Sequence, residues 1–331
     1  MRYIIKRILN LDYKNFFSKI KDISKKTRKN FLFVLFDVIR CAIKFGAGYM
    51  DYWLFLFYEK TDKEKATFIT RKFNDELVRK YNTKAAREYF IHKTLFNKKF
   101  KDFIGREYLE TKDLGYEEFS EFIDKHNVVF LKPDDKACGA GIEKVKVLDF
   151  KDKKEMFEYA TNGNFALIEE PIVQHEKMNE MYNFAVNTVR ICTLKIDGEV
   201  KLFYAAFRIG NEGKVVDNYN AGGMAAPVDC ETGKITNSAI DRTNTRYEHH
   251  PMTNTKILGF QIPLWDECVK CVKKAGEMVE DMGYVGWDVC VTESGPVLVE
   301  GNDFPGHDIQ IPKYPGDKTG FRSRYEEMKK A

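Results

Sequence analysis

One stretch near the C-terminal end limits most strongly what this chain can fold into: GWDVCVTESGPVLVEGNDFPG, residues 286–306. Two apolar runs of strand length flank a short polar turn, a pattern typical of a buried β-hairpin. Yet Asp288 lies inside the first run, and Glu300 and Asn302 end the second. Because burying an unpaired carboxylate costs free energy, we expect Asp288 to have a partner that needs its charge.

A divalent cation would be such a partner. On paired strands, Asp288 and Glu300 can point to the same side, and Glu300 and Asn302, two residues apart, share a strand face. Magnesium prefers oxygen ligands and usually takes one or two carboxylates together with phosphate oxygens and waters. The three residues therefore predict a magnesium site. The alternative, a polar strand end closed by a tight turn, accounts for Asn302 but gives no reason for Asp288.

A second stretch, FLKPDDKACGAGIEKV at residues 130–145, has the composition of a phosphate-binding loop. Lys132 ends a strand-like run, and Gly139 and Gly141 follow in a turn, where backbone N–H groups can approach phosphate oxygens closely. The pattern is neither a P-loop nor a dinucleotide fingerprint. An ordinary glycine-rich hairpin tip is the alternative explanation for this stretch alone.

Length and cysteine usage set wider bounds. At roughly 100–200 residues per domain, 331 residues predict two or three domains or subdomains. The seven cysteines are odd in number and scattered, which favours a reducing compartment, so we expect a cytoplasmic protein. Cys268 and Cys271 form a CxxC pair, but they lie at helical spacing among other apolar residues and no second pair follows. They predict a buried helix stripe rather than a zinc site.

Positive charge is concentrated at the N-terminus. Residues 1–30 hold ten Lys or Arg and two Asp, a net +8, which leaves −4 for the remaining residues because the whole chain carries +4. Apolar residues recur every three to four positions from Ile4 to Ile23, which predicts a basic amphipathic helix. Its stripe either docks on the body of the protein, the interpretation we favour, or contacts an anionic membrane surface. No nucleic-acid partner is expected, since no binding module accompanies the charge.

The rest of the chain divides into a helical part and a β-rich part. Residues 31–58 are strongly apolar but are interrupted by charged residues, so we expect buried helices rather than a membrane span. The pattern stays helical to about Asn127 and becomes β-type from Val128. Asp197-Gly198 between two such runs predicts a tight hairpin and hence an antiparallel sheet.

The order of these pieces points to a family. From N- to C-terminus the chain carries Lys84, Lys132 with its glycine-rich loop, the strand LIEEPI, and then the metal-ligand set. This order resembles the ATP-grasp superfamily of carboxylate ligases over about residues 80–312. Within it, AGYMDYWLFLFY, NTVRICT, FRIG, VDNYNAGGMAAPVD, GWDVCV and EGNDFPG are similar to the branch associated with sugar transfer and surface polysaccharides.

The resemblance implies an α+β ATP-grasp fold, in which two α+β subdomains clasp ATP, preceded by a helical N-terminal region. The implied parts are a helical region with the basic segment (1–75), a helical linker (76–127), a small subdomain with the glycine-rich loop (128–175), a large subdomain with the metal site (176–315) and a charged tail expected to fray (316–331).

It also implies roles for individual residues. Two magnesium ions would be bound, Glu300 bridging them while Asp288 holds one and Asn302 the other. Lys84, Lys132, Gly139 and Gly141 would bind the ATP phosphates, and the backbone of Glu169 and Ile172 would bind the adenine. Glu176 matches the ribose-binding carboxylate, although His175 is an alternative and both could simply lie in a solvated loop.

Two arginines lie inside β-type runs, where a guanidinium suits a phosphate or carboxylate partner unless its head is exposed. The segment from Arg208 through Asp217-Asn218 to Gly222-Gly223 resembles that of glutamate-adding ligases. The resemblance implies that Arg208, Arg190 and Asn218 are catalytic, with Arg208 contacting the transferred phosphoryl group and Arg190 a phosphate or acyl substrate. The chain departs from the D-alanine:D-alanine ligase pattern, because Gly286 stands where that pattern has a catalytic arginine two residues before the metal-binding aspartate.

The activity expected from the resemblance is an ADP-forming carboxylate-amine ligase that uses ATP and magnesium. Its substrates would be a small-molecule carboxylate and an amine or sugar, in cell-surface polysaccharide biosynthesis, in the cytoplasm or at the inner face of the membrane. A kinase that phosphorylates a hydroxyl with the same ATP site is an alternative, and a non-catalytic nucleotide-dependent scaffold is another.

Overall fold

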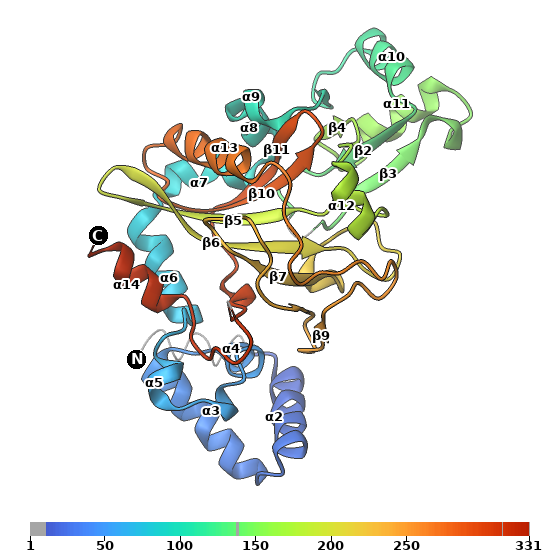
Figure 1. Cartoon of the computed structure of the whole chain (residues 1–331). Helices are drawn as coiled ribbons and strands as arrows, with labels where there is room; N and C mark the ends of the chain where they lie inside the picture. Colours follow the sequence, from blue (N-terminus) through green and yellow to red (C-terminus); the bar gives the residue numbers. More distant parts are fainter. Residues whose placement is uncertain (1–10, 137–138, 313, 331) are drawn as a thin grey trace. The chain divides into compact units, whose positions relative to one another are not determined.

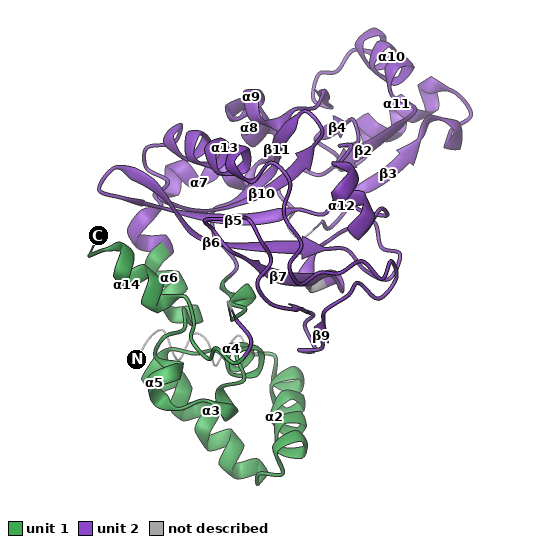
Figure 2. Cartoon of the chain, in the orientation of Figure 1, with its two compact units in different colours: residues 1–77, 307–312, 316–331 green, residues 78–306, 313–315 purple. Residues whose placement is uncertain are grey.

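The computed structural model of the chain describes residues 11–136, 139–312 and 314–330. The chain divides into two compact units, coloured separately in Figure 2. Unit 1 comprises residues 1–77, 307–312 and 316–331, and unit 2 comprises residues 78–306 and 313–315. The charged tail does not fray along its described length, since it contains the helix α14 (Arg322–Met328), whose Tyr325 is buried.

Unit 1 is helical. Its elements are α2 (Tyr13–Thr27), α3 (Phe31–Phe45), α4 (Tyr49–Leu54), α5 (Asp62–Lys65), the first part of α6 (Arg71–Tyr81), α14, and the 3-10 turns η1 (Phe57–Glu59) and η4 (His307–Ile309). Aromatic residues such as Tyr52 and Phe57 fill its core. Helix α2 buries Ile20 and Ile23 there, so this part of the basic amphipathic stripe packs inward. The part of the stripe at residues 4–9 lies outside the described residues.

Helix α3 buries only one of its faces. Val34, Val38 and Cys41 point into the core of unit 1, whereas Leu32 and Phe36 are exposed. The expectation that the apolar segment 31–58 would form buried helices is therefore wrong for this face of α3. Among the helices of the described residues, none combines the length and the apolar character that crossing a bilayer would need.

Unit 2 contains two antiparallel sheets (Figure 1). The smaller sheet has the order β1-β4-β2-β3. Its strands are β1 (Tyr108–Glu110), β2 (Val128–Lys132), β3 (Glu143–Lys146) and β4 (Leu167–Glu169), with η2 (Val147–Asp149) after β3. The helices α10 (Tyr116–Lys125) and α11 (Lys153–Asn162) form a core with this sheet, in which Phe119, Leu131 and Met156 are buried. The strand β2 is thus packed against these helices through Leu131.

The larger sheet has the order β11-β10-β5-β6-β7-β8-β9. Its strands are β5 (Val189–Ile196), β6 (Glu199–Ile209), β7 (Met224–Val228), β8 (Ala239–Ile240), β9 (Arg246–Tyr247), β10 (Tyr284–Thr292) and β11 (Gly295–Asn302). The remaining elements are α7 (Lys84–Ile91), α8 (Lys93–Lys99), α9 (Lys101–Ile104), α12 (Glu176–Met181), α13 (Trp265–Glu277) and η3 (Tyr219–Ala221). This sheet and its helices share one large apolar core.

Two local predictions are confirmed in the larger sheet. Asp197 and Gly198, both with positive φ, form the two-residue turn between β5 and β6. Cys268 and Cys271 lie buried on α13 as free thiols within the core of unit 2. Burial raises the pKa of the Cys271 thiol to about 11, which keeps it protonated at neutral pH.

Candidate active site

The hairpin of β10 and β11 places its polar residues together. Asp288 is paired directly opposite Glu300, and Gly286 opposite Asn302. Val289 then faces Leu298, which leaves Val299 as an extra residue in a β-bulge immediately before Glu300. A bulge bends the strand and redirects the side chains beside it. The carboxyl groups of Asp288 and Glu300 consequently interact inside the protein.

Asp288 is buried because two arginines partner it. Arg190, opposite it on β5, donates from Nε and Nη2 to the two carboxylate oxygens, and Nη1 of Arg208 on β6 donates over 2.7 Å. Burial alone would raise the pKa of Asp288, but the two guanidinium groups hold it well below its usual range. Asp288 is therefore a permanent carboxylate.

The neighbouring Glu300 is in the opposite situation. Burial, and then the charge of Asp288, raise the pKa of Glu300 above its ordinary value. Two carboxyl groups this close cannot both ionise without cost unless a cation lies beside them. A cation placed beside the two carboxyl groups would therefore favour the ionised form of Glu300.

The oxygen donors of this hairpin suit magnesium. A carboxylate offers about four lone-pair positions, and arginine N–H groups fill three of them on Asp288. The Nδ2 of Asn302 donates to the Gly286 carbonyl over 3.3 Å, which leaves its Oδ1 as a ligand atom. Within residues 11–136, 139–312 and 314–330, no three His, Cys, Asp or Glu side chains form a metal-binding group. A site here would consist of two carboxylates and one amide, completed by phosphate and water.

Gly286 makes room for Arg190. A Cβ atom at position 286 would lie 3.1 Å from Cδ of Arg190 and 3.5 Å from its Nη1. The side chain of Arg190 thus occupies the space beside position 286.

Arg208 connects the hairpin to the loop after β6. Its Nη2 donates to Asp217 over 2.9 Å, and Asp217 also accepts from the N–H and hydroxyl of Thr188. Burial raises the pKa of Asp217, which Arg208 opposes. The Nε of Arg208 is buried without a hydrogen-bond partner among the described residues. Asn218 follows Asp217 in the chain. Its carbonyl accepts hydrogen bonds from the N–H groups of Ala221 and Gly223 and so shapes the turn before β7.

Two adjoining cavities of unit 2 meet at this network. The larger has a volume of about 350 Å³ and the smaller about 190 Å³. Both are lined by Lys132, Ile142, Glu169, Val299 and Glu300. The predicted residues Gly139, Ile172, Arg208, Asn218 and Asp288 line the larger cavity as well, and Asn302 lines the smaller one. Most of the predicted set is therefore brought together.

Four predicted residues do not line these two cavities. Lys84 is the first residue of α7 and is exposed, and Glu176, at the start of α12, is exposed as well. Arg190 binds the carboxylate of Asp288, which lines the larger cavity, but does not line that cavity itself. Gly141, like Gly139, has a positive φ that favours glycine, but it lines a separate hollow beside α11. The polar residues that line the larger cavity in and beside α12 include Gln174, Asn179 and Asn183 instead.

Lys93 is a cavity lysine that sequence reasoning missed. It lines the smaller cavity, and its Nζ donates to the carbonyl of Lys136 over 2.6 Å and to that of Asp134 over 3.3 Å. Burial lowers the pKa of Lys93, partly offset by the charge of Glu300. Lys93 begins a helix shortly after Lys84 does, and the order of motifs alone does not distinguish the two lysines.

Arg106 was missed as well. Its Nε donates to the Glu169 carboxylate over 2.7 Å, and its Nη1 donates to the carbonyl of Leu298 over 2.8 Å. The same carboxylate accepts from Lys132 over 2.6 Å and from Asn97 over 2.9 Å. Arg106 therefore links β4 of the smaller sheet to the bulged strand β11 of the larger sheet. Burial would raise the pKa of Glu169, but Arg106 and Lys132 keep it well below its usual range.

The model of one protein family, sugar-transfer associated ATP-grasp, matches residues 72–329. The chain belongs to this family. The predicted family and the predicted α+β ATP-grasp fold are thereby confirmed. A search of curated proteins finds no match for this ATP-grasp chain.

Several solved structures are similar to this ATP-grasp chain. The ATP-grasp ligase PsnB complexed with a minimal precursor is 16% identical, with 74% of this chain and 63% of that one covered and a TM-score of 0.42. D-alanyl-alanine synthetase A from Vibrio cholerae is 14% identical, with 73% of this chain and 61% of that one covered and a TM-score of 0.42. D-alanine-D-alanine ligase from Helicobacter pylori is 16% identical, with 73% of this chain and 61% of that one covered and a TM-score of 0.41. The chain thus spans less than two thirds of the length of each of these three proteins.

Proposed function

We propose that the protein is an ADP-forming ligase that uses ATP and magnesium to activate a carboxylate as an acyl phosphate, which an amine then attacks. The observation that carries the proposal is that the buried Asp288 and the partly exposed Glu300 line the larger cavity together with Arg208 and Lys132. Such a cluster suits the transfer of a terminal phosphoryl group, in which charge must be balanced without a protein nucleophile.

The proposed nucleotide contacts lie around the larger cavity. The backbone of Glu169 and Ile172 would bind the adenine, and the apolar side chains of Val173 and Val216 line the same cavity. Lys132 would neutralise phosphate oxygens while Glu169 holds its ammonium in place. Gly139, with φ of 74°, lets the loop backbone approach the phosphates.

Lys93 is proposed in place of Lys84 as the second phosphate lysine, because it lines the smaller cavity and Lys84 does not. For the ribose, Gln174 or Asn179 replaces Glu176 in the proposal for the same reason.

Asp288, Glu300 and Asn302 would hold the two magnesium ions, whose chemistry is to neutralise the charge on the transferred phosphoryl group. Arg208 faces the same cavity, so its guanidinium would stabilise the phosphoryl oxygens. Arg190 would act through Asp288, which it orients, rather than by touching a substrate. Asn218 lines the larger cavity next to Asp217 and would contact a substrate there.

The proposed substrates are a small-molecule carboxylate and an amine on a sugar or amino acid, in the synthesis of a surface polysaccharide, with the enzyme in the cytoplasm. The family description supports the sugar context. Products are proposed to be ADP and phosphate, because Lys93, Lys132 and Arg208 line the cavities and would neutralise the terminal phosphates.

Trapping with hydroxylamine tests the proposal. The protein is incubated with ATP, magnesium and pools of amino acids and sugar acids, with hydroxylamine present. We expect a hydroxamate of the true carboxylate substrate together with ADP, since a strong nucleophile intercepts an acyl phosphate. A stable phosphate ester of an alcohol without any hydroxamate would identify a kinase instead. AMP and pyrophosphate as products would contradict both.

A further inference from the structure

The exposed face of α3 is unusually apolar. Its large side chains are strongly exposed: Leu32 (68%), Phe33 (57%), Phe36 (67%), Ile39 (47%) and Ile43 (68%). Leu32, Phe36, Ile39 and Ile43 recur at intervals of four, three and four residues, so they form one stripe along the helix. The opposite face of α3 is buried in the core of unit 1. The helix is therefore packed on the core of unit 1 through its other face, and the exposed stripe takes no part in that packing.

The neighbouring helix α2 extends this surface. Tyr13 and Phe17 of α2 are also about half exposed, and the ring of Phe17 stacks on Phe31 at the start of α3 with 6.4 Å between centroids. Contiguous exposed apolar area of this kind marks an interaction site on a protein. We call Tyr13, Phe17 and the five α3 residues the apolar face.

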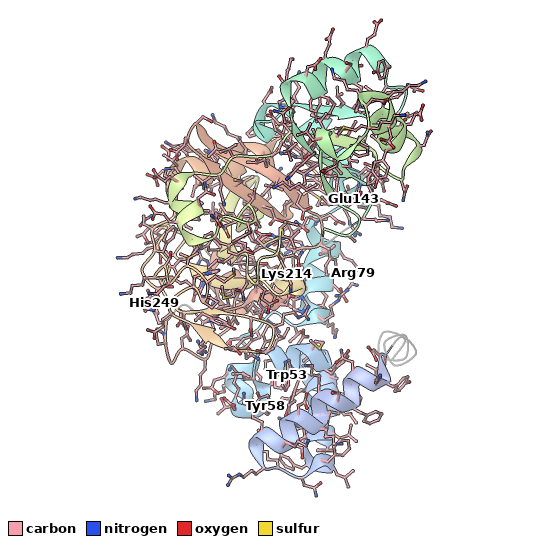
Figure 3. The ribbon with its side chains drawn as sticks, turned by 90° about the vertical axis from the view of Figure 1, so that its right-hand side faces the viewer. Trp53, Tyr58, Arg79, Glu143, Lys214 and His249 are labelled. Carbon is pink, nitrogen blue, oxygen red and sulfur yellow. The ribbon has the colours of Figure 1, made fainter. Side chains whose placement is uncertain are left out.

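The segment that carries the apolar face is strongly basic. Residues 13–45 contain nine Lys or Arg and two Asp, a net charge of +7. Some of the lysines pack on aromatic rings, such as Lys19 over Trp53 at 4.3 Å and Lys26 over Tyr58 at 5.8 Å; both rings are labelled in Figure 3. The exposed Lys21 and Lys25 form no ion pair with any described residue, so their charge is available to a partner.

We propose that the apolar face, together with the lysines of α2, docks unit 1 on an anionic lipid bilayer. Apolar side chains enter the boundary between headgroups and acyl chains, while lysines beside them attract anionic headgroups. A second copy of the chain fits less well, because pairing two such faces would bring two segments of charge +7 together. A nucleic acid would match the charge but leave the apolar stripe in water.

The proposal concerns unit 1 and does not depend on the ligase assignment. It also differs from contact through residues 1–10, because every residue of the apolar face lies on α2 or α3. These helices lie in the interface rather than across the membrane, since none in the described ranges could span it.

Sedimentation with vesicles tests the proposal on the full chain. The protein is mixed with vesicles of phosphatidylcholine alone or of phosphatidylcholine with phosphatidylglycerol. We expect binding to the anionic vesicles, little to the neutral ones, and a decrease as salt is raised, because salt screens the headgroup charge. Equal binding to both kinds of vesicle, or binding to neither, would overturn the proposal.

Variants locate the contact. Phe36→Ser with Ile43→Ser should weaken binding about tenfold or more, while the melting temperature and ATP turnover without vesicles stay unchanged, since both side chains face solvent. The matched control is Leu148→Ser, an exposed leucine (92%) of unit 2, which should bind normally. Lys21→Glu with Lys25→Glu should weaken binding to anionic vesicles only.

Two other outcomes would overturn the proposal. Deleting residues 1–10 should leave vesicle binding intact; loss of binding on this deletion would assign the contact to those residues instead. If the wild type dimerises in solution, and the Phe36 and Ile43 substitutions abolish the dimer while wild-type protein ignores anionic vesicles, the apolar face is an interface between copies of the chain.

Discussion

The guanidinium of Arg106 lies 2.7 Å from the carboxylate of Glu169, and both side chains are only 2% exposed. This ion pair has a second function, because Glu169 also holds the ammonium of Lys132 and Arg106 also binds the carbonyl of Leu298 beside the bulge at Val299. One arginine therefore fixes a lysine of the proposed phosphate site and the strand that carries Glu300.

Arg106→Leu should lower the free energy of unfolding by about 3 to 5 kcal/mol, because it leaves Glu169 buried with less compensating charge. Arg106→Lys should lower it less, since it keeps the charge but loses the forked geometry. Urea denaturation measures both. The exposed Arg79, labelled in Figure 3, supplies the control Arg79→Leu, which should change stability little. Equal effects at the two positions would mean that the Arg106 network contributes nothing.

Lys93→Ala should weaken ATP binding about tenfold or more, because one charged hydrogen bond to a phosphate is lost. Lys84→Ala is the matched control and should leave affinity unchanged, since Lys84 is exposed and away from both cavities. Calorimetry with ATP and magnesium distinguishes them. The reverse result would restore Lys84 as the phosphate lysine. Lys132→Ala is a poorer test, because it also removes a partner of buried Glu169.

The sequence could predict pairings that are set over short distances. The hairpin that places Asp288 opposite Glu300 follows from strand alternation and one tight turn, and the turn at Asp197-Gly198 follows from its residue types. The family could be predicted because several separated motifs occur in the right order. These features depend on neighbours in the chain, or on strands that pair locally.

Other features depend on which distant segments meet. Lys84 and Lys93 are both helical lysines in the sequence, and only tertiary packing decides that the second one lines a cavity. Arg106 has no sequence pattern of its own, since its partners lie 63 and 192 positions away. The apolar segment containing α3 was expected to be buried because hydrophobicity alone does not tell how many faces of a helix find a partner.

Glu300→Gln should reduce the turnover rate about 100-fold or more. It should not lower the melting temperature in the absence of ligands. The second part follows from geometry: Glu300 lies opposite the buried carboxylate of Asp288 in the hairpin, so a neutral amide removes an unfavourable neighbour. Release of ADP and differential scanning calorimetry measure the two effects. Near-normal rates would remove Glu300 from the metal assignment, and a large loss of stability would contradict the proposed strain between the carboxyl groups.

The ion pair between His307 and Asp51 in unit 1 should make stability depend on pH. Nε2 of His307 lies 2.8 Å from the buried carboxylate of Asp51. Burial would lower the pKa of His307, but Asp51 raises it above its ordinary value, and Asp51 itself has a lowered pKa. A raised histidine pKa means that the folded state holds a proton that the unfolded state releases at neutral pH.

The stability contributed by His307 is therefore complete below about pH 6.5, the unfolded value, and is lost as the pH rises through its folded pKa. The contribution of Asp51 is lost only in acid, as the pH falls through its lowered pKa. Urea denaturation from about pH 6 to about pH 9 should show that the free energy of unfolding falls as the pH rises for wild type, and falls less for His307→Gln. The control is His249→Gln, at an exposed histidine labelled in Figure 3, which should follow wild type. A slope that persists in His307→Gln would assign the dependence elsewhere.

Substitutions of Arg208 and Arg190 should have different effects, because Arg208 is proposed to contact the reacting phosphoryl group and Arg190 to orient Asp288. Both donate to Asp288, but only Arg208 lines the larger cavity, and its buried Nε has no partner among the described residues. We expect Arg208→Lys to lower kcat for hydroxamate formation about 100-fold, with little change in KM for ATP, because the lost contact is made to the phosphoryl group in transit. Arg190→Lys keeps a cation beside Asp288 and should chiefly raise the magnesium concentration needed for half-maximal rate, since it disturbs the orientation of a metal ligand. If instead Arg190→Lys lowers kcat as strongly at saturating magnesium, the arginine that fills the space beside Gly286 takes part in the chemical step directly.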